Sequence, residues 1–238
     1  MNDSVTASTP LMPVVAGHLA TLSTGLEFIN TNDLWPVTHD HLDSPETALN
    51  WLVDHDLLHS EARTHLLAQY GGAPAMGAEM LARLRRVRQA MRGVLEASAS
   101  GKPPQASDLE EMNRALRTHY IYELVPAPDG LSLDHRHQGD PVDGAMARLA
   151  ESIARELIQG DTSRLRVCEN TQCRWVFKDT SRTGKRKWCS MRSCGNRAKV
   201  ARHRARRKLT EPSGFSAESS AGSLSDFPAP LGGGVDAG

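Results

Sequence analysis

The residues best suited to chemistry in this 238-residue chain are its four cysteines, which all lie in one short segment. They form two pairs, Cys168 with Cys173 and Cys189 with Cys194, and each pair encloses four residues. Fifteen residues separate the pairs, which is typical of a four-thiolate zinc site, because each pair supplies two ligands from one turn. Four cysteine ligands leave no position for water, so the spacing predicts one structural Zn²⁺ and not a catalytic ion.

Two other states are compatible with four cysteines: two disulfides, or four unlinked thiols. The first twenty residues lack the basic start and the clean apolar stretch of a secretion signal. We therefore expect a reducing, cytoplasmic location, which disfavours disulfides. The clustering of all four cysteines in one basic segment disfavours unlinked thiols. No stretch is apolar enough for a membrane span, so a membrane is not an expected partner.

The charge of the chain is strongly segregated, although its formal net charge is zero. The segment from Arg164 to Lys208 contains 16 Lys and Arg but 2 Asp and Glu, whereas the remaining residues contain 12 and 26. This segregation indicates a module that binds a polyanion, joined to an acidic body. Double-stranded DNA is the partner that we expect.

The candidate nucleic-acid contacts lie in a loop before the second cysteine pair and in a helix predicted from Cys194 to about Leu209. They are Lys185, Arg186, Lys187, Asn196, Arg197, Lys199, Arg202, Arg204, Arg206, Arg207 and Lys208. We expect Asn196 and Arg197 to contact base edges and the later cations to contact phosphates. Asn196 has an equally good alternative role as a capping or loop residue beside the metal. Because the cations of this helix repel one another, we expect it to order fully only on nucleic acid.

Three aromatic residues near the cysteines, Trp175, Phe177 and Trp188, have two interpretations. They could stack on unpaired bases, which would favour a single-stranded or RNA partner. The favoured interpretation is that they form the small core of a finger with almost no other apolar residues.

Several of these residues resemble the CGNR zinc finger. The matching runs are Trp188-Cys189-Ser190-Met191, Cys194-Gly195-Asn196-Arg197 and the stretch from Cys173 to Ser181. Upstream, Leu26-Glu27-Phe28-Ile29-Asn30-Thr31 is similar to the opening motif of the ABATE domain, which usually precedes this finger in bacterial transcription regulators. The family more often has an apolar residue and Asp where this chain has Leu26-Glu27. The resemblance covers about residues 15–208 and implies DNA binding.

The elements predicted to position these residues are mainly helices. Helix signals begin at Ser44-Pro45, Ser60, Pro74, Ser107 and Asp140, and the longest helix is expected from about Pro74 to Ala97. Residues 18–31 predict a hairpin or a strand, while residues 120–125 and 131–135 predict a β-hairpin with a five-residue loop. The expected fold class is α+β, mainly α: a helical N-terminal body with a small β-hairpin, then a small zinc-finger domain and a basic C-terminal helix.

The predicted domain organisation has four parts. Residues 1–17 are expected to be a disordered lead-in, and residues 18–160 an ABATE-like regulatory or ligand-binding body. Residues 161–209 are expected to form the CGNR-type finger with its basic helix. Residues 210–238 are rich in Ser, Gly, Ala and Pro, which predicts a disordered tail.

The long helix of the body carries its own group of cations, which have two interpretations. They are Arg83, Arg85, Arg86, Arg88 and Arg92, and they lie mostly off the apolar stripe of the helix. They could form a second nucleic-acid surface. The favoured interpretation is a solvated helix face.

Enzymatic sites in the body are not indicated by any motif. His55 and His59 are four residues apart and could share a metal on one helix face, but no Glu follows His55 as in zinc proteases, so a solvated surface is favoured. Asn30 and Thr31 are a candidate ligand pocket, with an Asx-type turn after a strand as the favoured alternative. No nucleophile elbow, phosphate loop or dinucleotide motif is present, so we predict that the chain is not an enzyme.

Together these features predict a DNA-binding transcription regulator with a structural Zn²⁺. The N-terminal domain would be a sensor or interaction domain with a small-molecule effector. Because one finger reads few base pairs, we expect a homodimer. The alternatives are an RNA-binding or ribosome-associated zinc protein and a protein-interaction adaptor.

Overall fold

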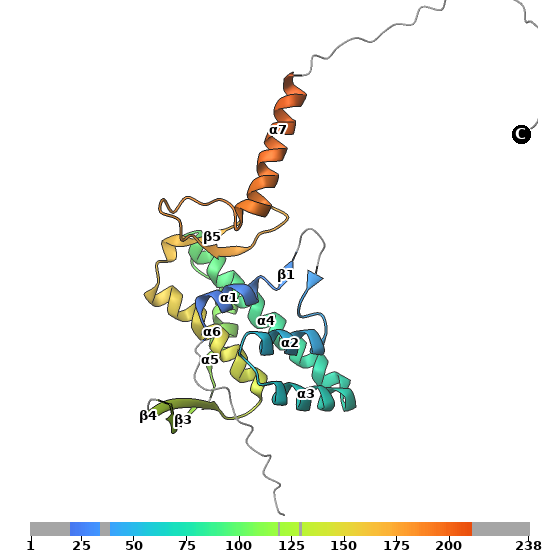
Figure 1. Cartoon of the computed structure of the whole chain (residues 1–238), viewed down its shortest axis with the longest axis vertical. Coiled ribbons are helices and arrows are strands. Elements are labelled where there is room, and N and C mark those ends of the chain that lie inside the picture. Colours follow the sequence, from blue (N-terminus) through green and yellow to red (C-terminus); the bar gives the residue numbers. More distant parts are fainter. Residues whose placement is uncertain (1–19, 34–38, 119, 129, 211–238) are drawn as a thin grey trace, which may run out of the picture. The chain divides into compact units, whose positions relative to one another are not determined.

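The computed structural model describes residues 20–33, 39–118, 120–128 and 130–210 (Figure 1). The predicted lead-in and the tail beyond residue 210 lie outside the described residues. The chain divides into two compact units, one ending at Ala198 and one beginning at Lys199, and each is described by itself. Among the described residues, no helix combines the length and the apolar character needed to span a membrane.

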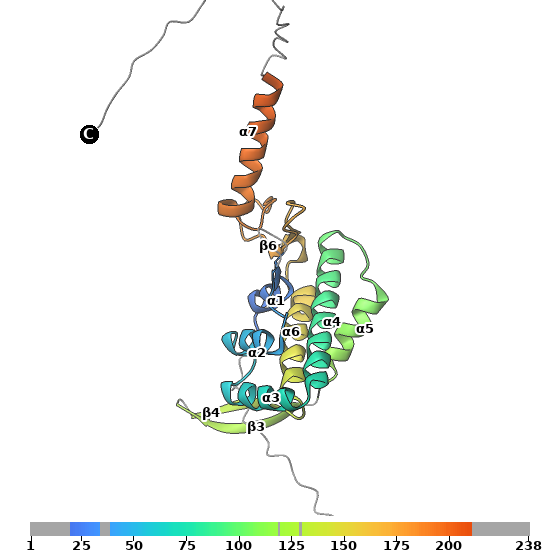
Figure 2. The ribbon, with the colours of Figure 1, turned by 90° about the vertical axis from the view of Figure 1, so that its right-hand side faces the viewer.

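The fold is mainly helical, as the sequence predicts. The helices are α1 (Leu22–Ile29), α2 (Pro45–Asp54), α3 (Ser60–Gly72), α4 (Pro74–Ala99), α5 (Ala106–Leu116), α6 (Pro141–Gln159) and α7 (Asn196–Thr210). Helix α4 packs against the five helices α1, α2, α3, α5 and α6, and α4, α5 and α6 lie side by side (Figures 1 and 2). Their buried faces meet in one apolar core, whose fully buried residues include Leu49, Met80, Met91, Leu149 and Ile153. This core fixes the positions of α1, whose C-cap Asn30 contacts the zinc finger, and of α4, whose Arg92 also contacts it.

The small strands form three antiparallel pairs. They are β1 (Asn32–Asp33) with β2 (His39–Asp40), β3 (Tyr120–Ala127) with β4 (Gly130–His137), and β5 (Leu165–Val167) with β6 (Val176–Lys178). The predicted hairpin is present as β3–β4, but the predicted loop length of five residues is wrong. Ala127 pairs with Gly130, whose φ of +129° is readily adopted by glycine, so two residues connect the strands.

Helix starts follow local capping chemistry at two of the predicted positions. Ser44 and Thr47 form a reciprocal capping box before α2, and Asp140 accepts a hydrogen bond from the Val142 backbone at the start of α6. Helix α4 begins at Pro74 as predicted, but the caps predicted at Ser60 and Ser107 are wrong. Ser60 is the first residue of α3 rather than its cap, and α5 begins at Ala106, before the predicted capping box, with no side-chain cap.

The hairpin or strand predicted at residues 18–31 is wrong, because this segment contains helix α1. Thr21 caps the helix by accepting a hydrogen bond from the Thr24 backbone, so the polar residues that suggested a turn lie at a helix start. Gly25 serves close packing rather than a turn. A Cβ built there would lie 2.5 Å from Ser152 Oγ and 2.9 Å from Ile153 Cδ1 on α6. The signal that favoured a turn therefore reflects contact between two helices.

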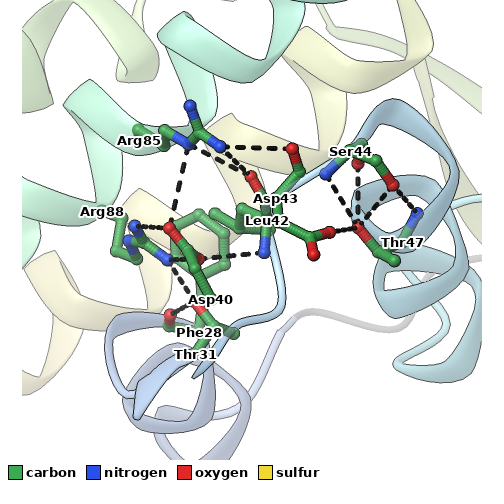
Figure 3. A network of polar contacts seen from close by, with 9 residues as sticks. All are labelled: Phe28, Thr31, Asp40, Leu42, Asp43, Ser44, Thr47, Arg85 and Arg88. Atoms are coloured by element: carbon green, nitrogen blue, oxygen red, sulfur yellow. Dashed lines mark hydrogen bonds and ion pairs between the residues drawn. The ribbon is translucent and has the colours of Figure 1, made fainter. Parts of the chain in front are cut away.

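The arginines of α4 are held by acids and carbonyls of the body, and among them the predicted solvated face is present only at Arg85 and Arg86, which are exposed. Arg88 donates to both carboxylate oxygens of Asp40, at 2.5 and 2.9 Å, and to Thr31 Oγ1 at 2.9 Å (Figure 3). Arg85 donates to the Leu42 carbonyl at 2.6 and 3.1 Å, and Arg83 pairs with Asp140 and Asp143. The remaining pairs are Arg86 with Glu79 and Glu111, and Arg92 with Glu96. Sequence periodicity missed these roles because most of the partner acids come from other elements.

Candidate metal centre and basic helix

The four cysteines converge to a geometry that fits zinc. Their sulfurs all lie within 4.8 Å of one another, with Cys173 Sγ 3.6 Å and Cys194 Sγ 3.9 Å from Cys189 Sγ. A tetrahedral ion with Zn–S bonds of about 2.3 Å would hold its sulfurs about 3.8 Å apart. Among the described residues, this is the one group of three or more potential ligands found close enough to hold a metal. The predicted ligand set is thus brought together.

Each cysteine pair is held by a tight turn. Cys168 follows β5, and its N–H donates to the Trp175 carbonyl at 2.8 Å. Between the first pair, Asn170 accepts from the Cys173 backbone, and Arg174 adopts a left-handed φ of +57° directly after the ligand. Cys194 lies in a π-helical turn (Met191–Gly195) that leads into α7. Cys168 and Cys194 are buried, while the other two are partly exposed.

The surroundings of the thiols oppose their ionisation at two ligands. Burial raises the pKa of the Cys173 thiol to about 11, and burial together with the charge of Cys168 raises that of Cys189 well above its usual range. At Cys194, burial is outweighed by neighbouring donors, led by the Asn170 amide at 3.4 Å, and the pKa is lowered. Because zinc binds thiolates, the ion must displace protons from these groups, so its affinity falls as pH falls.

Asp179, in the stretch from Cys173 to Ser181 that resembles the CGNR finger, is a structural residue of the finger. Its carboxylate accepts hydrogen bonds from the Ser181 backbone at 2.9 Å and the Arg186 backbone at 2.8 Å. Against the effect of burial, these donors lower the pKa of Asp179 to about 2, so the residue stays ionised. It therefore closes the loop that carries the predicted basic triplet. The Asp-x-Ser pattern of an Asx turn is the signal that could have identified it.

The basic loop is partly committed to the finger itself. Arg186 donates to the Cys189 carbonyl at 2.6 Å, and its guanidinium lies 5.0 Å from the centre of the Phe177 ring. Lys187 pairs with Glu169 at 3.2 Å in an exposed ion pair, and Lys185 is exposed. Arg186 thus has a structural role in addition to any contact with a partner.

The candidate residues of α7 lie on both sides of the unit boundary. Asn196 is exposed, and its amide donates to the Arg192 carbonyl at 3.2 Å, as in its alternative role as a capping or loop residue. The candidates of the second unit whose side chains are described are exposed: Lys199, Arg202, Arg204, Arg206 and Arg207. Lys208 lies in the helix, but its side chain is outside the described part. No Asp or Glu occurs in α7.

The aromatic residues of the finger divide between the two interpretations. Phe177 is buried with Cys168 and Cys194, and Trp188 packs against this cluster, which confirms the small-core role for these two. Trp175 is 37% exposed.

The finger is held to the body by polar contacts and by shared apolar packing. The Asn30 amide donates to the Val176 carbonyl at 2.9 Å and accepts from the Val176 N–H at 3.1 Å, both in buried surroundings. Arg92 of α4 donates to the Arg174 carbonyl, and Lys178 pairs with Glu156 at 2.7 Å. Leu165 and Val176 of the finger belong to the same apolar core as the body helices. The first strands of the finger are therefore built into the body.

Asn30 and Thr31 follow a helix, so the Asx-type turn after a strand is wrong. Asn30 is the C-cap of α1, and Thr31 donates to the Phe28 carbonyl at 2.7 Å while accepting from Arg88. Both residues line a cleft of about 370 Å³ at the junction of body and finger. Other lining residues are Glu27, Trp51 and His55 from the body and Trp175, Phe177 and Cys189 from the finger.

His55 and His59 do not lie on one helix face, because α2 ends at Asp54 and α3 begins at Ser60. The His55 ring instead stacks on Trp51, with ring centres 3.8 Å apart. The shared-metal alternative is therefore wrong.

Two known family models match this chain, one over the helical body and one over the zinc finger. A family model described as "Putative stress-induced transcription regulator", the ABATE model, matches residues 22–161. The CGNR zinc finger model matches residues 164–207. A search of curated proteins finds no match to the chain. The finger match and the cysteine geometry together identify the site of one structural Zn²⁺.

Proposed function

The chain belongs to the ABATE family, and on that premise we propose that it regulates transcription by binding double-stranded DNA through its zinc finger and basic helix. The observation that carries the proposal is the composition of α7, which has seven Lys and Arg and no acid over Asn196–Thr210. A helix of this charge supplies counterion release on a polyanion, and that is the main source of non-specific DNA affinity.

Within this proposal the zinc site provides the structural support. One Zn²⁺ would be held by the four cysteines and would fix the turn from which α7 starts. Arg197 and Asn196, at the helix start, would contact base edges, with Arg suited to guanine and Asn to adenine. The later cations of the helix and the exposed Lys185 would contact phosphates. Arg186 and Lys187 would contribute after giving up part of their present contacts.

The body would act as the sensor or interaction domain. A small-molecule effector at the cleft beside Asn30 and Thr31 would alter DNA affinity, and DNA would alter effector affinity by the same factor. We further propose a cytoplasmic homodimer, since two fingers would read a longer site than one.

A salt series on the zinc-loaded protein tests this function. About six phosphate contacts give a slope near −5 for log affinity against log salt on duplex DNA. Replacing Arg204, Arg206 and Arg207 by Gln should make the slope shallower by about 2.7, since three contacts are lost. The matched control is Lys102→Gln in the linker after α4, which should leave both slope and affinity unchanged.

One observation favours a second candidate, the RNA-binding or ribosome-associated protein. Trp175 is 37% exposed, and an exposed indole is suited to stacking on an unpaired base. Quenching of tryptophan emission by single strands, with higher affinity than for duplex, would support this candidate against the first. Negligible binding to duplex DNA, single-stranded DNA and structured RNA would instead support the protein-interaction adaptor.

A further inference from the structure

We infer that the cleft between α1, α2 and the zinc finger binds an aromatic amine, a ligand with one flat ring system and one protonated nitrogen. The inference rests on the sensor role proposed above, and it specifies the ligand class and the way in which ligand and finger are coupled.

The cleft has the size and the walls of a small-molecule site. Its volume of about 370 Å³ lies in the range of about 300–1,000 Å³ that is usual for such sites. Trp51 of the body and Trp175 and Phe177 of the finger line it. The Trp51 ring is held in place by Phe28, at 5.4 Å between ring centres, and by His55 at 3.8 Å. Aromatic side chains from both the body and the finger favour a flat apolar ring, which can bury its surface against them.

The one acidic side chain of the cleft favours a cation. The described lining residues include one carboxylate, Glu27, and two histidines, His41 and His55, but no Lys or Arg. The Glu27 side chain is 57% exposed, so an incoming group can reach it. An anionic ligand would meet this carboxylate with no lining Lys or Arg to offset the repulsion.

The hydrogen bonds of His55 give the amine a specific position. His55 Nδ1 lies 2.7 Å from the Trp51 carbonyl, which can only accept, so this nitrogen carries a hydrogen. His55 Nε2 then faces Glu27 Oε2 at 3.2 Å, and two acceptors at this distance require a hydrogen between them. A ligand ammonium beside Glu27 supplies a hydrogen at this position from outside.

Asn30 and Thr31 would act as positioning residues and not as ligand contacts. The Asn30 amide is hydrogen-bonded to Val176 through both its nitrogen and its oxygen, and Thr31 is hydrogen-bonded to Phe28 and Arg88. Asn30 thereby holds the finger wall against the body wall, while Thr31 ties the end of α1 to α4 on the body side. A ligand that touches both walls stabilises this arrangement, and the arrangement in turn strengthens ligand binding.

The test is calorimetric titration of the zinc-loaded full-length protein, without nucleic acid, with three indole probes. Tryptamine carries an ammonium, tryptophol a hydroxyl and indole-3-acetate a carboxylate. We expect tryptamine to bind at least tenfold more tightly than tryptophol, and indole-3-acetate to bind most weakly. Glu27→Gln should remove the advantage of tryptamine over tryptophol, whereas Trp51→Leu should weaken both. The matched control is Glu61→Gln at an exposed position of α3, which should change neither affinity.

Equal affinity for the three probes, a preference for the carboxylate, or no heat with any probe would overturn the inference. So would an unchanged tryptamine affinity in Glu27→Gln, which alters an exposed side chain and should fold normally. A DNA titration of the same preparation judges the proposed function separately. Tryptamine binding without DNA binding would retain the ligand site and reject the regulator, and the reverse result would do the opposite.

Discussion

Helices α4 and α7 are both rich in arginine, but they use it in opposite ways. The five arginines from Arg83 to Arg92 in α4 each contact a carboxylate, and three of them also contact a backbone carbonyl or a hydroxyl. Helix α7 has no acid of its own, and its side chains from Lys199 to Arg207 are exposed. The comparison teaches that the distribution of acids around a helix, more than its arginine content, separates structural cations from candidate contacts to a polyanion.

The largest expected effect is removal of the metal, which should affect the two helices differently. Structural zinc contributes roughly 10–16 kcal/mol in zinc-finger peptides near neutral pH. Chelation, or Cys194→Ser, should therefore unfold the turn from which α7 begins, while α4 stays folded in its apolar core. Hydrogen exchange resolved by segment, with zinc content measured in parallel, checks this. Protection of α4 lost together with that of the finger would contradict the separation.

The next largest effect is a difference in unfolding free energy when single arginines of the two helices are replaced. Arg88→Met leaves the Asp40 carboxylate without its closest cation in partly buried surroundings, which should cost about 3 kcal/mol of unfolding free energy. Arg204→Met, the same change at an exposed position of α7, should cost less than about 0.5 kcal/mol. Urea unfolding of the two variants measures the difference. Equal losses would remove the distinction drawn between the helices.

A smaller loss of unfolding free energy is expected when Arg92, the arginine of α4 that contacts the finger, is replaced. Its guanidinium donates to the carbonyls of Ile29 and Arg174, so Arg92→Met leaves both acceptors with one donor fewer. We expect a cost of about 2 kcal/mol and faster zinc loss to a chelator. Arg114→Met, an exposed arginine on α5, serves as the control. Unchanged zinc release in Arg92→Met would mean that the body does not support the finger through this contact.

The smallest effect should be a pH dependence of stability that arises from α4, through its ion pair between Arg88 and Asp40. Burial alone would raise the pKa of Asp40. The hydrogen bond from Arg88 and several weaker contacts outweigh burial and lower this pKa below its usual value near 3.8. Stability from this pair is therefore present above about pH 4 and is lost as pH falls through the lowered pKa. Urea midpoints of Arg88→Met should fall less than those of the unaltered protein between pH 5 and pH 3. A parallel fall in both would argue against the pair as the source.

Short sequence patterns were sufficient to predict some features of the fold and the site, but not others. Cysteine spacing predicted the zinc ligands, because both pairs lie in turns whose geometry is set within a few residues. The cap at Ser44 was predictable for the same reason. In contrast, Asn30 meets Val176 across 146 positions of sequence, and Arg88 meets Asp40 across 48. Pairings of this kind depend on how the helices pack, which no short pattern contains.

The placement of Leu165 and Val176 in the core of the body limits how the finger can be reused. Cut at the boundary between the two family matches, the finger would carry two exposed apolar side chains and would lose Asn30 as the partner of Val176. Grafting it onto another protein should therefore fail unless the helices that cover it are transferred as well. The smallest unit that can be transferred to another protein, by engineering or by gene fusion in evolution, is therefore the body and the finger together.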